Sequence, residues 1–170
     1  MHKKQPILYI FSGLPASGKS TLSQKLAHHV SAVYLRIDTV EQAIKDLCSF
    51  KVEGEGYRLS YRVAADNLNL GLSVVADSCN PIELTRQEWE QVAKDANSTF
   101  INIEISCSNR KEHKNRVEKR KSTVANLELP TWTDVENREY LAWSTHLVEV
   151  DTAFKTVDES FNELIEKINQ

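Results

Sequence analysis

Residues 13–21 read GLPASGKST, and they fit the pattern GxxxxGK[ST], in which two glycines, a lysine and a hydroxyl residue stand at fixed positions. The apolar run 7–11 precedes this segment, and a helix-periodic stretch follows it. A glycine-containing loop between a strand and a helix forms a P-loop, whose backbone N–H groups and helix N-terminus surround phosphate oxygens. This part of the chain is therefore predicted to bind a nucleoside triphosphate.

The polar groups of the loop have expected partners on the nucleotide. Lys19 supplies a point charge to the β- and γ-phosphates, and the hydroxyl of Ser20 is a ligand for the Mg²⁺ that bridges them. A turn that matches the pattern by chance is the alternative, and the flanking strand and helix argue against it. We expect ATP and Mg²⁺ as ligands, and the residues expected to hold the nucleotide are Gly13, Pro15, Ala16, Ser17, Gly18, Lys19, Ser20 and Thr21.

Apolar runs and helix-periodic segments alternate along the sequence. This alternation predicts an α/β fold with a parallel sheet and right-handed helical crossovers. A chain of 170 residues has the length of one domain with a hydrophobic core. We therefore expect residues 1–170 to form a single domain. The runs expected to be buried strands are 7–11, 33–37, 73–76, 99–105 and 147–150.

Capping boxes predict where several helices begin. A Ser, Thr, Asp or Asn followed three residues later by Glu or Gln satisfies the free N–H groups of a first helical turn. Pro81 would occupy the first helical position after one such cap. The expected pairs are Thr39 with Gln42, Asn80 with Glu83, Thr133 with Glu136, and Thr156 with Glu159. In the last helix, the spacing predicts core packing by Val157, Phe161, Leu164, Ile165 and Ile168.

Charge and cysteine content limit the classes of partner and compartment. A net charge of −3 gives no general attraction to nucleic acid or to anionic membranes. Cys48, Cys79 and Cys107 are widely spaced and odd in number, which argues against a disulfide framework or a zinc site and fits a reducing cytoplasm. The N-terminal apolar run leads into the P-loop instead of a cleavage site, so we expect no signal peptide. No apolar stretch is long enough to span a membrane.

Asp38 and Asp77 stand where the second and third expected strands end. Ligands of an open parallel sheet bind outside the carboxyl ends of its strands, so both carboxylates are expected beside the P-loop. One can organise Mg²⁺ while the other accepts the proton of an attacking hydroxyl. We assign proton acceptance to Asp38 and the metal to Asp77, with the reverse assignment left open. A helix-capping role for Asp38 and a solvated loop position for Asp77 are the simpler alternatives.

The segment 110–121 holds seven Lys and Arg residues against two Glu. Arg116 and Arg120 are four residues apart, so in a helix they share one face and reach the same phosphates. Such a segment suits a lid that closes over ATP and neutralises charge in the transition state. An ordinary solvated charged helix remains an alternative. Nucleic-acid binding has less support, because no aromatic residues are interleaved with the basic ones.

The motifs together resemble the small P-loop kinases, a group that includes chloramphenicol phosphotransferase, gluconate kinase, zeta-toxin kinases and the 5′-kinase module of phage-type polynucleotide kinase. The similarity is strongest to bacterial kinases labelled as AAA-family ATPases. The matching segments span most of the chain: GLPASGKST, LRID at 35–38, VVADSCNP at 74–81, HKNRVEKR at 113–120 and LPTWTDVENREYLAW at 129–143.

The resemblance implies a nucleoside-monophosphate-kinase-like fold, with a five-stranded parallel sheet between helices and a helical lid at about residues 108–130. It implies that Asp38 is the general base and that Arg116 and Arg120 bind the transferring phosphate. The polynucleotide kinases have an arginine three residues after the base, whereas this chain has Glu41. Residues expected to shape the acceptor pocket are Tyr57, Arg58, Tyr61, Arg62 and Asn80, with Trp132 and Trp143 either covering it or packing the lid.

The sequence therefore predicts a cytoplasmic kinase that transfers the γ-phosphoryl of ATP to a hydroxyl of a small-molecule acceptor. Lys19, Asp38, Arg116 and Arg120 are the expected catalytic residues, and Ser20 and Asp77 the expected metal ligands. A 5′-hydroxyl polynucleotide kinase is one alternative. A nucleotide-hydrolysing switch or binding module is the other, although the DxxG and NKxD segments of a GTPase switch are missing.

Overall fold

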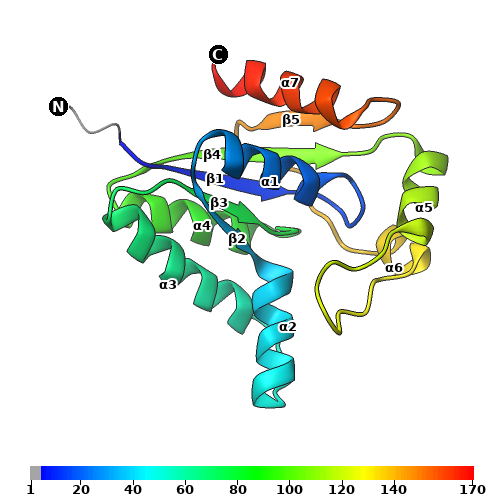
Figure 1. The fold of residues 1–170 in the computed structure, drawn as a ribbon, viewed down its shortest axis with the longest axis horizontal. Coiled ribbons are helices and arrows are strands. Elements are labelled where there is room, and N and C mark those ends of the chain that lie inside the picture. The colour runs from blue at the N-terminus through cyan, green and yellow to red at the C-terminus, as the bar shows by residue number, and fades with distance from the viewer. Residues whose placement is uncertain (1–4) are drawn as a thin grey trace.

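The computed structural model describes residues 5–170, and its centre is a sheet of five parallel strands in the order β2-β3-β1-β4-β5 (Figure 1). Each expected run is a strand, and no strand end differs from the expected one by more than one residue. The prediction of a parallel α/β fold is therefore confirmed. The strands are β1 Ile7–Ser12, β2 Val33–Arg36, β3 Val74–Asp77, β4 Thr99–Ser106 and β5 Val148–Asp151.

Helices cover both faces of the sheet. On one face, Tyr9 and Phe11 of β1 pack with α1 (Lys19–His29) and α7 (Val157–Ile168). On the other face, the intervening Leu8 and Ile10 pack with α3 (Glu55–Asn69) and α4 (Glu83–Asp95). A strand that is buried on both faces needs apolar residues at successive positions. This requirement explains why β1 reads as a continuous apolar run instead of an alternating one.

The remaining helices lie toward the carboxyl ends of the strands. Helix α2 (Ile37–Cys48) follows β2 directly and projects away from the sheet, while α5 (Arg110–Lys119) and α6 (Trp132–Glu136) stand beyond the tips of the central strands (Figure 1). Strand tips and surrounding helices thus enclose the region where a ligand of a parallel sheet is expected. Within residues 5–170, no helix is both long enough and apolar enough to cross a membrane.

Only one of the four expected capping boxes is present as written: Thr156 with Glu159 caps α7. Helix α6 begins at Trp132, and its capping box is formed by Thr131 and Asp134. Glu136, which was expected to pair with Thr133, binds Arg110 instead. The prediction for Thr133 and Glu136 was therefore wrong by two residues.

The caps predicted before α2 and α4 are also wrong. Helix α2 starts at Ile37, which places Thr39 inside its first turn, and the Gln42 amide donates to Asp46 on the next turn at 2.8 Å. Helix α4 starts at Glu83, because the Asn80 side chain is used elsewhere: its Nδ2 donates to the Phe11 carbonyl at 3.0 Å. Of these expected cap residues, Gln42 makes a contact within its own helix, and Asn80 makes a tertiary contact with β1.

Core packing of α7 is confirmed for four of its five expected residues. Leu164 is fully buried, and Phe161, Ile165 and Ile168 are partly buried against the same cluster. Val157 is exposed, because it lies in the first turn of α7 and lines the cavity at the strand tips.

Candidate functional site

A cavity of about 680 Å³ lies at the carboxyl ends of β1, β2 and β3. The P-loop and the start of α1 form its floor, and the segment from α5 to residue 130 lies over it. Side chains from distant parts of the sequence meet around it, and those used below are Lys19, Ser20, Arg36, Asp38, Glu41, Cys79, Arg116, Arg120, Arg138 and Thr152.

The P-loop backbone is curled: the N–H groups of Gly13 and Ser17 donate to the carbonyls of Cys79 and Leu14, and those of residues 14, 16 and 18 have no partner among residues 5–170. Gly13 and Gly18 have φ angles of 138° and 100°, which favour glycine, and a side chain at Gly13 would collide with the Ile105 carbonyl. Gly18 is the N-cap of α1 and provides no side-chain acceptor for the first N–H groups of that helix. The buried Ser17 hydroxyl has no hydrogen-bond partner among residues 5–170. These free donors form an anion site at a helix N-terminus.

Asp77 holds Lys19 at the bottom of the cavity. The Lys19 ammonium donates to Oδ1 of Asp77 at 2.9 Å, and the Tyr34 hydroxyl donates to Oδ2 at 2.6 Å. Burial acts to raise the pKa of Asp77, but Lys19, Ser20 and Tyr34 outweigh it and the pKa is lowered. Burial likewise acts to lower the pKa of Lys19, and Asp77 reverses the effect. The pair therefore remains charged in the absence of a phosphate group.

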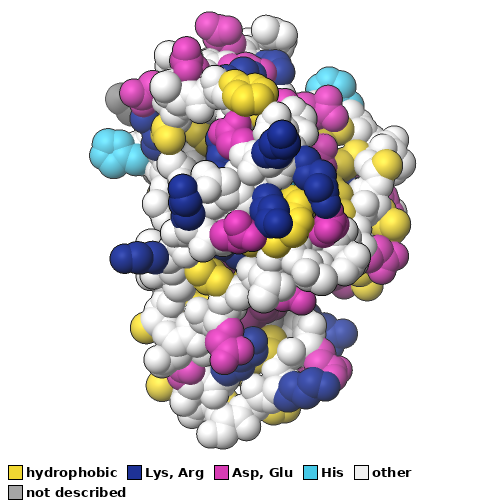
Figure 2. Space-filling model, turned by 90° about the vertical axis from the view of Figure 1, so that its right-hand side faces the viewer, with side chains coloured by type: hydrophobic (Ala, Val, Ile, Leu, Met, Phe, Trp, Pro, Cys, Tyr) yellow, Lys and Arg dark blue, Asp and Glu magenta, His cyan; other side chains and the backbone are white. Residues whose placement is uncertain are grey.

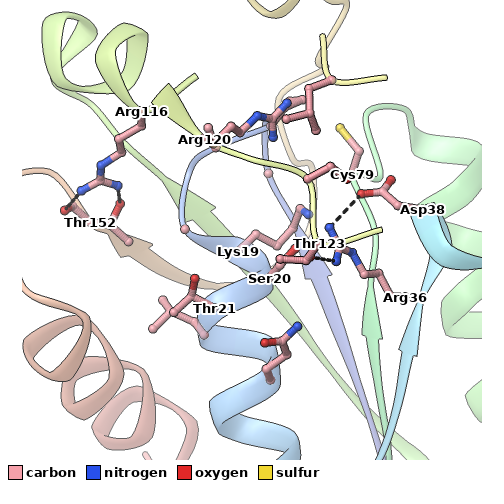
Figure 3. A pocket seen from close by; sticks show the side chains of 18 of the residues that line it. Lys19, Ser20, Thr21, Arg36, Asp38, Cys79, Arg116, Arg120, Thr123 and Thr152 are labelled. Carbon is pink, nitrogen blue, oxygen red and sulfur yellow. Dashed lines mark hydrogen bonds and ion pairs between the residues drawn. The ribbon is translucent and has the colours of Figure 1, made fainter. Parts of the chain in front are cut away.

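Asp38 is the more accessible of the two candidate carboxylates. It lies in the first turn of α2, its side chain is 51% exposed, and Arg36 Nη2 lies 3.6 Å from Oδ2 (Figure 3). By contrast, the Asp77 side chain is 1% exposed. Asp38 thus faces the cavity with room for a ligand atom, while Asp77 is enclosed by protein donors.

The two lid arginines line the cavity in different ways. Arg116 Nη1 donates to Thr152 Oγ1 at 2.7 Å, whereas Nε and Nη2 of Arg120 are buried and have no partner among residues 5–170 (Figure 3). Arg120 is the C-cap of α5, and its backbone N–H donates to the Arg116 carbonyl at 3.1 Å, but the two guanidinium groups extend in different directions (Figure 3). Burial lowers the pKa of Arg120. A buried guanidinium without a partner is costly unless a ligand binds it.

Thr152 connects the lid helix with the P-loop. Its hydroxyl lies 2.7 Å from the Ser17 carbonyl and also accepts from Arg116. His113 of α5 makes a second connection, with Nε2 at 2.8 Å from the Pro15 carbonyl. Helix α5 is thereby held against the loop from two sides.

The loop that follows α5 crosses to the opposite wall of the cavity. Thr123 Oγ1 accepts from Arg36 Nη1 at 2.8 Å, and the Asn126 amide donates to Asp46 of α2 at 3.1 Å. Seen from the side of α5 and α6, basic side chains stand among acidic ones, without a continuous basic groove on that face (Figure 2). The loop after α5 is thus in contact with β2 and α2.

Several residues expected in the acceptor pocket lie behind it or outside it. Arg58 and Arg62 are exposed on α3 and do not line the cavity. The Tyr57 hydroxyl accepts from the Asn80 N–H at 3.2 Å, and Tyr61 packs edge-on against Trp89 with ring centroids 4.6 Å apart.

The two tryptophans support the walls of the cavity without lining it. Trp132 packs edge-on against His113 at the base of the lid, with ring centroids 5.5 Å apart, and Trp143 stacks on Arg86 of α4. The sequence prediction did not include Tyr34, Arg36 or Thr152. Tyr34 and Thr152 belong to no motif, and Arg36 lies within the LRID segment without an assigned role; the folded sheet brings these side chains to the P-loop.

The residues present fit a nucleotide-bound Mg²⁺. Ser20 provides a hydroxyl beside the Asp77 carboxylate, and such oxygen ligands suit Mg²⁺ together with phosphate oxygens and water. Residues 5–170 contain no group of three or more His, Cys, Asp and Glu side chains that could hold a metal alone. A metal at this position would therefore depend on the phosphates of the nucleotide.

The fold is similar to several solved structures, among them two kinases. The Mycobacterium tuberculosis APS kinase CysC, in complex with AMPPNP and APS, has a TM-score of 0.73 at 17% identity, over 98% of this chain and 99% of that chain. A gluconokinase from Sinorhizobium meliloti has a TM-score of 0.70 at 13% identity, over 97% and 93%. Chaetomium thermophilum Kti12, in complex with ADP-AlF3, has a TM-score of 0.69 at 21% identity, over 95% and 96%.

A protein-family model matches most of the chain. No curated protein matches the sequence. A family model described as an AAA domain matches residues 8–137, which include the P-loop, both candidate carboxylates and the segment 108–130 that was expected to be a lid. Because this match covers most of the chain, the protein belongs to the AAA domain family, as a P-loop protein with the fold of small kinases.

Proposed function

We propose that this protein transfers the γ-phosphoryl group of ATP to a hydroxyl group of a small-molecule acceptor. The observation that carries the proposal is that one cavity joins a P-loop, an open carboxylate at Asp38 and a half-buried guanidinium at Arg120, whose Nε and Nη2 have no partner among residues 5–170. Phosphoryl transfer requires these parts: a phosphate cradle, a proton acceptor and positive charge around the transferred group. Residues 108–130 serve as the lid.

Different residues of the chain act on the phosphoryl donor and on the acceptor. The P-loop amides bind the β- and γ-phosphates, Lys19 exchanges Asp77 for a phosphate oxygen, and Arg116 and Arg120 stabilise charge on the transferred group. Asp38 accepts the proton as the acceptor oxygen bonds to the γ-phosphorus and the bond to the bridging oxygen of ADP breaks. The products are ADP and a phosphate ester.

Ser20 and Asp77 would hold Mg²⁺, which when bound neutralises phosphate charge. The enclosure of Asp77 supports this assignment over a role as base: its pKa is lowered and both of its oxygens already accept hydrogen bonds. Asp38 has free space beside it and lines the cavity on the acceptor side. These differences support Asp38 as the proton acceptor.

Asp38→Asn tests the proposal most directly. The variant keeps the shape of the side chain and cannot accept the proton, so ATP affinity should stay within about threefold while kcat falls by about 10²-fold or more. Binding is measured by calorimetry with AMPPNP. Transfer is measured as acceptor-dependent ADP release across alcohols, sugars, nucleosides, antibiotics and a 5′-hydroxyl oligonucleotide.

Two further variants complete this experiment. Lys19→Ala should weaken both binding and transfer, because the P-loop charge is lost, while Asp66→Asn on the exposed face of α3 should change neither. Unchanged transfer by Asp38→Asn would remove Asp38 from the mechanism. Transfer to the oligonucleotide alone would favour the 5′-kinase alternative.

A further inference from the structure

Glu41 lies in the acceptor half of the cavity, one helical turn after Asp38. Residues three apart on a helix have Cβ atoms about 5–6 Å from each other, so both carboxylates stand on one face of α2. Both line the cavity. The stem of Glu41 lies against Gly56 at the start of α3, where any Cβ would collide with Glu41 Cγ. The missing side chain at Gly56 therefore leaves the room that Glu41 occupies.

The Glu41 carboxylate has no ion-pair partner within 4.0 Å among residues 5–170. Four charged groups surround it at longer range: Asp38 and Glu55 are acidic, and Lys45 and Arg138 are basic. Glu55 is occupied by the N–H groups of residues 53 and 54, and the Arg138 guanidinium lies 3.7 Å from Cys79 Sγ. Burial, followed by the charge of Asp38, raises the pKa of Glu41. The carboxylate is thus partly desolvated without a neutralising contact.

Charge is distributed unevenly along the cavity. Its donor half contains Lys19, Arg116 and Arg120, which suits a triphosphate, whereas Asp38 and Glu41 lie side by side in the acceptor half, where Arg36 and Arg138 also line the cavity. Arg36, the basic residue nearest to Asp38, also contacts Asp77 and Thr123. Because Arg36 and Arg138 contact other groups, a ligand that places a cation beside Glu41 would give this carboxylate the ion pair that it lacks, whereas an anionic ligand would add a negative charge beside it.

We propose that Glu41 selects the acceptor by charge and that the acceptor is an amino alcohol. Its hydroxyl faces Asp38, and its protonated amine binds the Glu41 carboxylate. This inference rests on the proposed function, since it assigns one end of the acceptor to Asp38. It also explains why a phosphate-rich acceptor such as a nucleic acid fits poorly: its nearest phosphate would meet an unpaired carboxylate.

The test compares matched probes that differ in charge. With AMPPNP bound, affinities are measured by calorimetry for serinol, glycerol and glycerate, and for glucosamine, glucose and gluconate. In at least one series, the wild type should bind the amine about tenfold more tightly than the neutral compound, with the acid weakest. Glu41→Gln keeps the shape and removes the charge, so this preference should shrink to about twofold or less. Glu53→Gln, on an exposed residue between α2 and α3, is the matched control and should keep it.

The outcomes separate this inference from the proposed function. Equal binding of amine and acid by the wild type, absence of binding by both amines, or an unchanged preference in Glu41→Gln would each overturn the role of Glu41. Phosphorylation of neutral alcohols with no preference for amines over acids would also overturn the role of Glu41, but it would support the proposed kinase activity. Charge-selective binding that Glu41→Gln abolishes would support the inference even if no phosphoryl transfer were detected.

Discussion

Tyr34 shows how a residue outside every motif takes a place in the site. It lies on β2, and its hydroxyl reaches Asp77 because β2 and β3 are neighbours, with Tyr34 beside Val75 in the register. Burial raises the pKa of Tyr34, and the Asp77 charge raises it further. The phenol therefore remains a donor to the buried carboxylate at neutral pH.

Tyr34→Phe removes this donor with little change of shape. One of the three groups that lower the Asp77 pKa is lost, so we expect the free energy of unfolding to fall by about 1–3 kcal/mol. The Mg²⁺ concentration needed for half-maximal AMPPNP binding should rise severalfold, because Asp77 is less firmly oriented. Denaturant titration and calorimetry measure the two effects. Tyr9→Phe, in the core on β1, is the control, and an equal loss of stability in this variant would show that only packing matters.

The sequence predicts the residues that belong to local motifs and misses those that depend on neighbouring strands. The P-loop, Asp38 and Asp77 follow from spacing along the chain, and they line or border one cavity. Arg36 and Thr152 carry no such spacing, since their contacts join β2 to the lid and β5 to the P-loop. Long-range contacts of this kind cannot be derived from local patterns.

At the scale of elements, the positions of the strands were predicted well and the helix starts poorly. Strand positions follow from buried apolar runs, which have few alternatives. Helix starts were assigned from capping residues, and the side chain of Asn80 binds the first strand and its end instead of the helix that follows it. A polar side chain satisfies whichever donor or acceptor the fold brings near, so the local cap competes with tertiary partners.

The hydrogen bond between Arg36 and Thr123 is predicted to hold the loop that follows α5. Thr123→Val removes the hydrogen bond from Arg36 across the cavity while keeping the side-chain volume. Hydrogen exchange in residues 120–129 should speed up severalfold, and the melting temperature should change little, because the loop contributes few buried contacts. Exchange followed by mass spectrometry measures the first and calorimetry the second. Thr133→Val on α6 should leave exchange in 120–129 unchanged, and equal exchange in Thr123→Val would show that this bond does not hold the loop.

For the whole molecule, the alternation of strands and helices predicts the layers but not the strand order. Chain sections that are far apart become neighbours: β1 lies between β3 and β4. A second long-range link joins α4 to the coil before β5. Arg86 is 1% exposed, and its guanidinium donates to the carbonyls of Asn80, Leu141 and Ala142. The same side chain stacks on Trp143, with 4.2 Å to the ring centroid.

Arg86→Met should therefore weaken the whole fold. The substitution keeps an apolar stem but removes a buried cation that binds carbonyl groups from two distant segments, and hydrogen bonds to charged groups contribute about 1.5–3 kcal/mol each. Because the bonds act together and the coil can relax, we expect the free energy of unfolding to fall by about 2–4 kcal/mol. Denaturant titration measures the loss, and the near-ultraviolet circular dichroism of Trp143 reports whether its stacking is retained. Arg62→Met, on the exposed side of α3, should change stability by less than about 0.5 kcal/mol. If Arg86→Met were as stable as Arg62→Met, the buried guanidinium would not be what holds the C-terminal coil against α4.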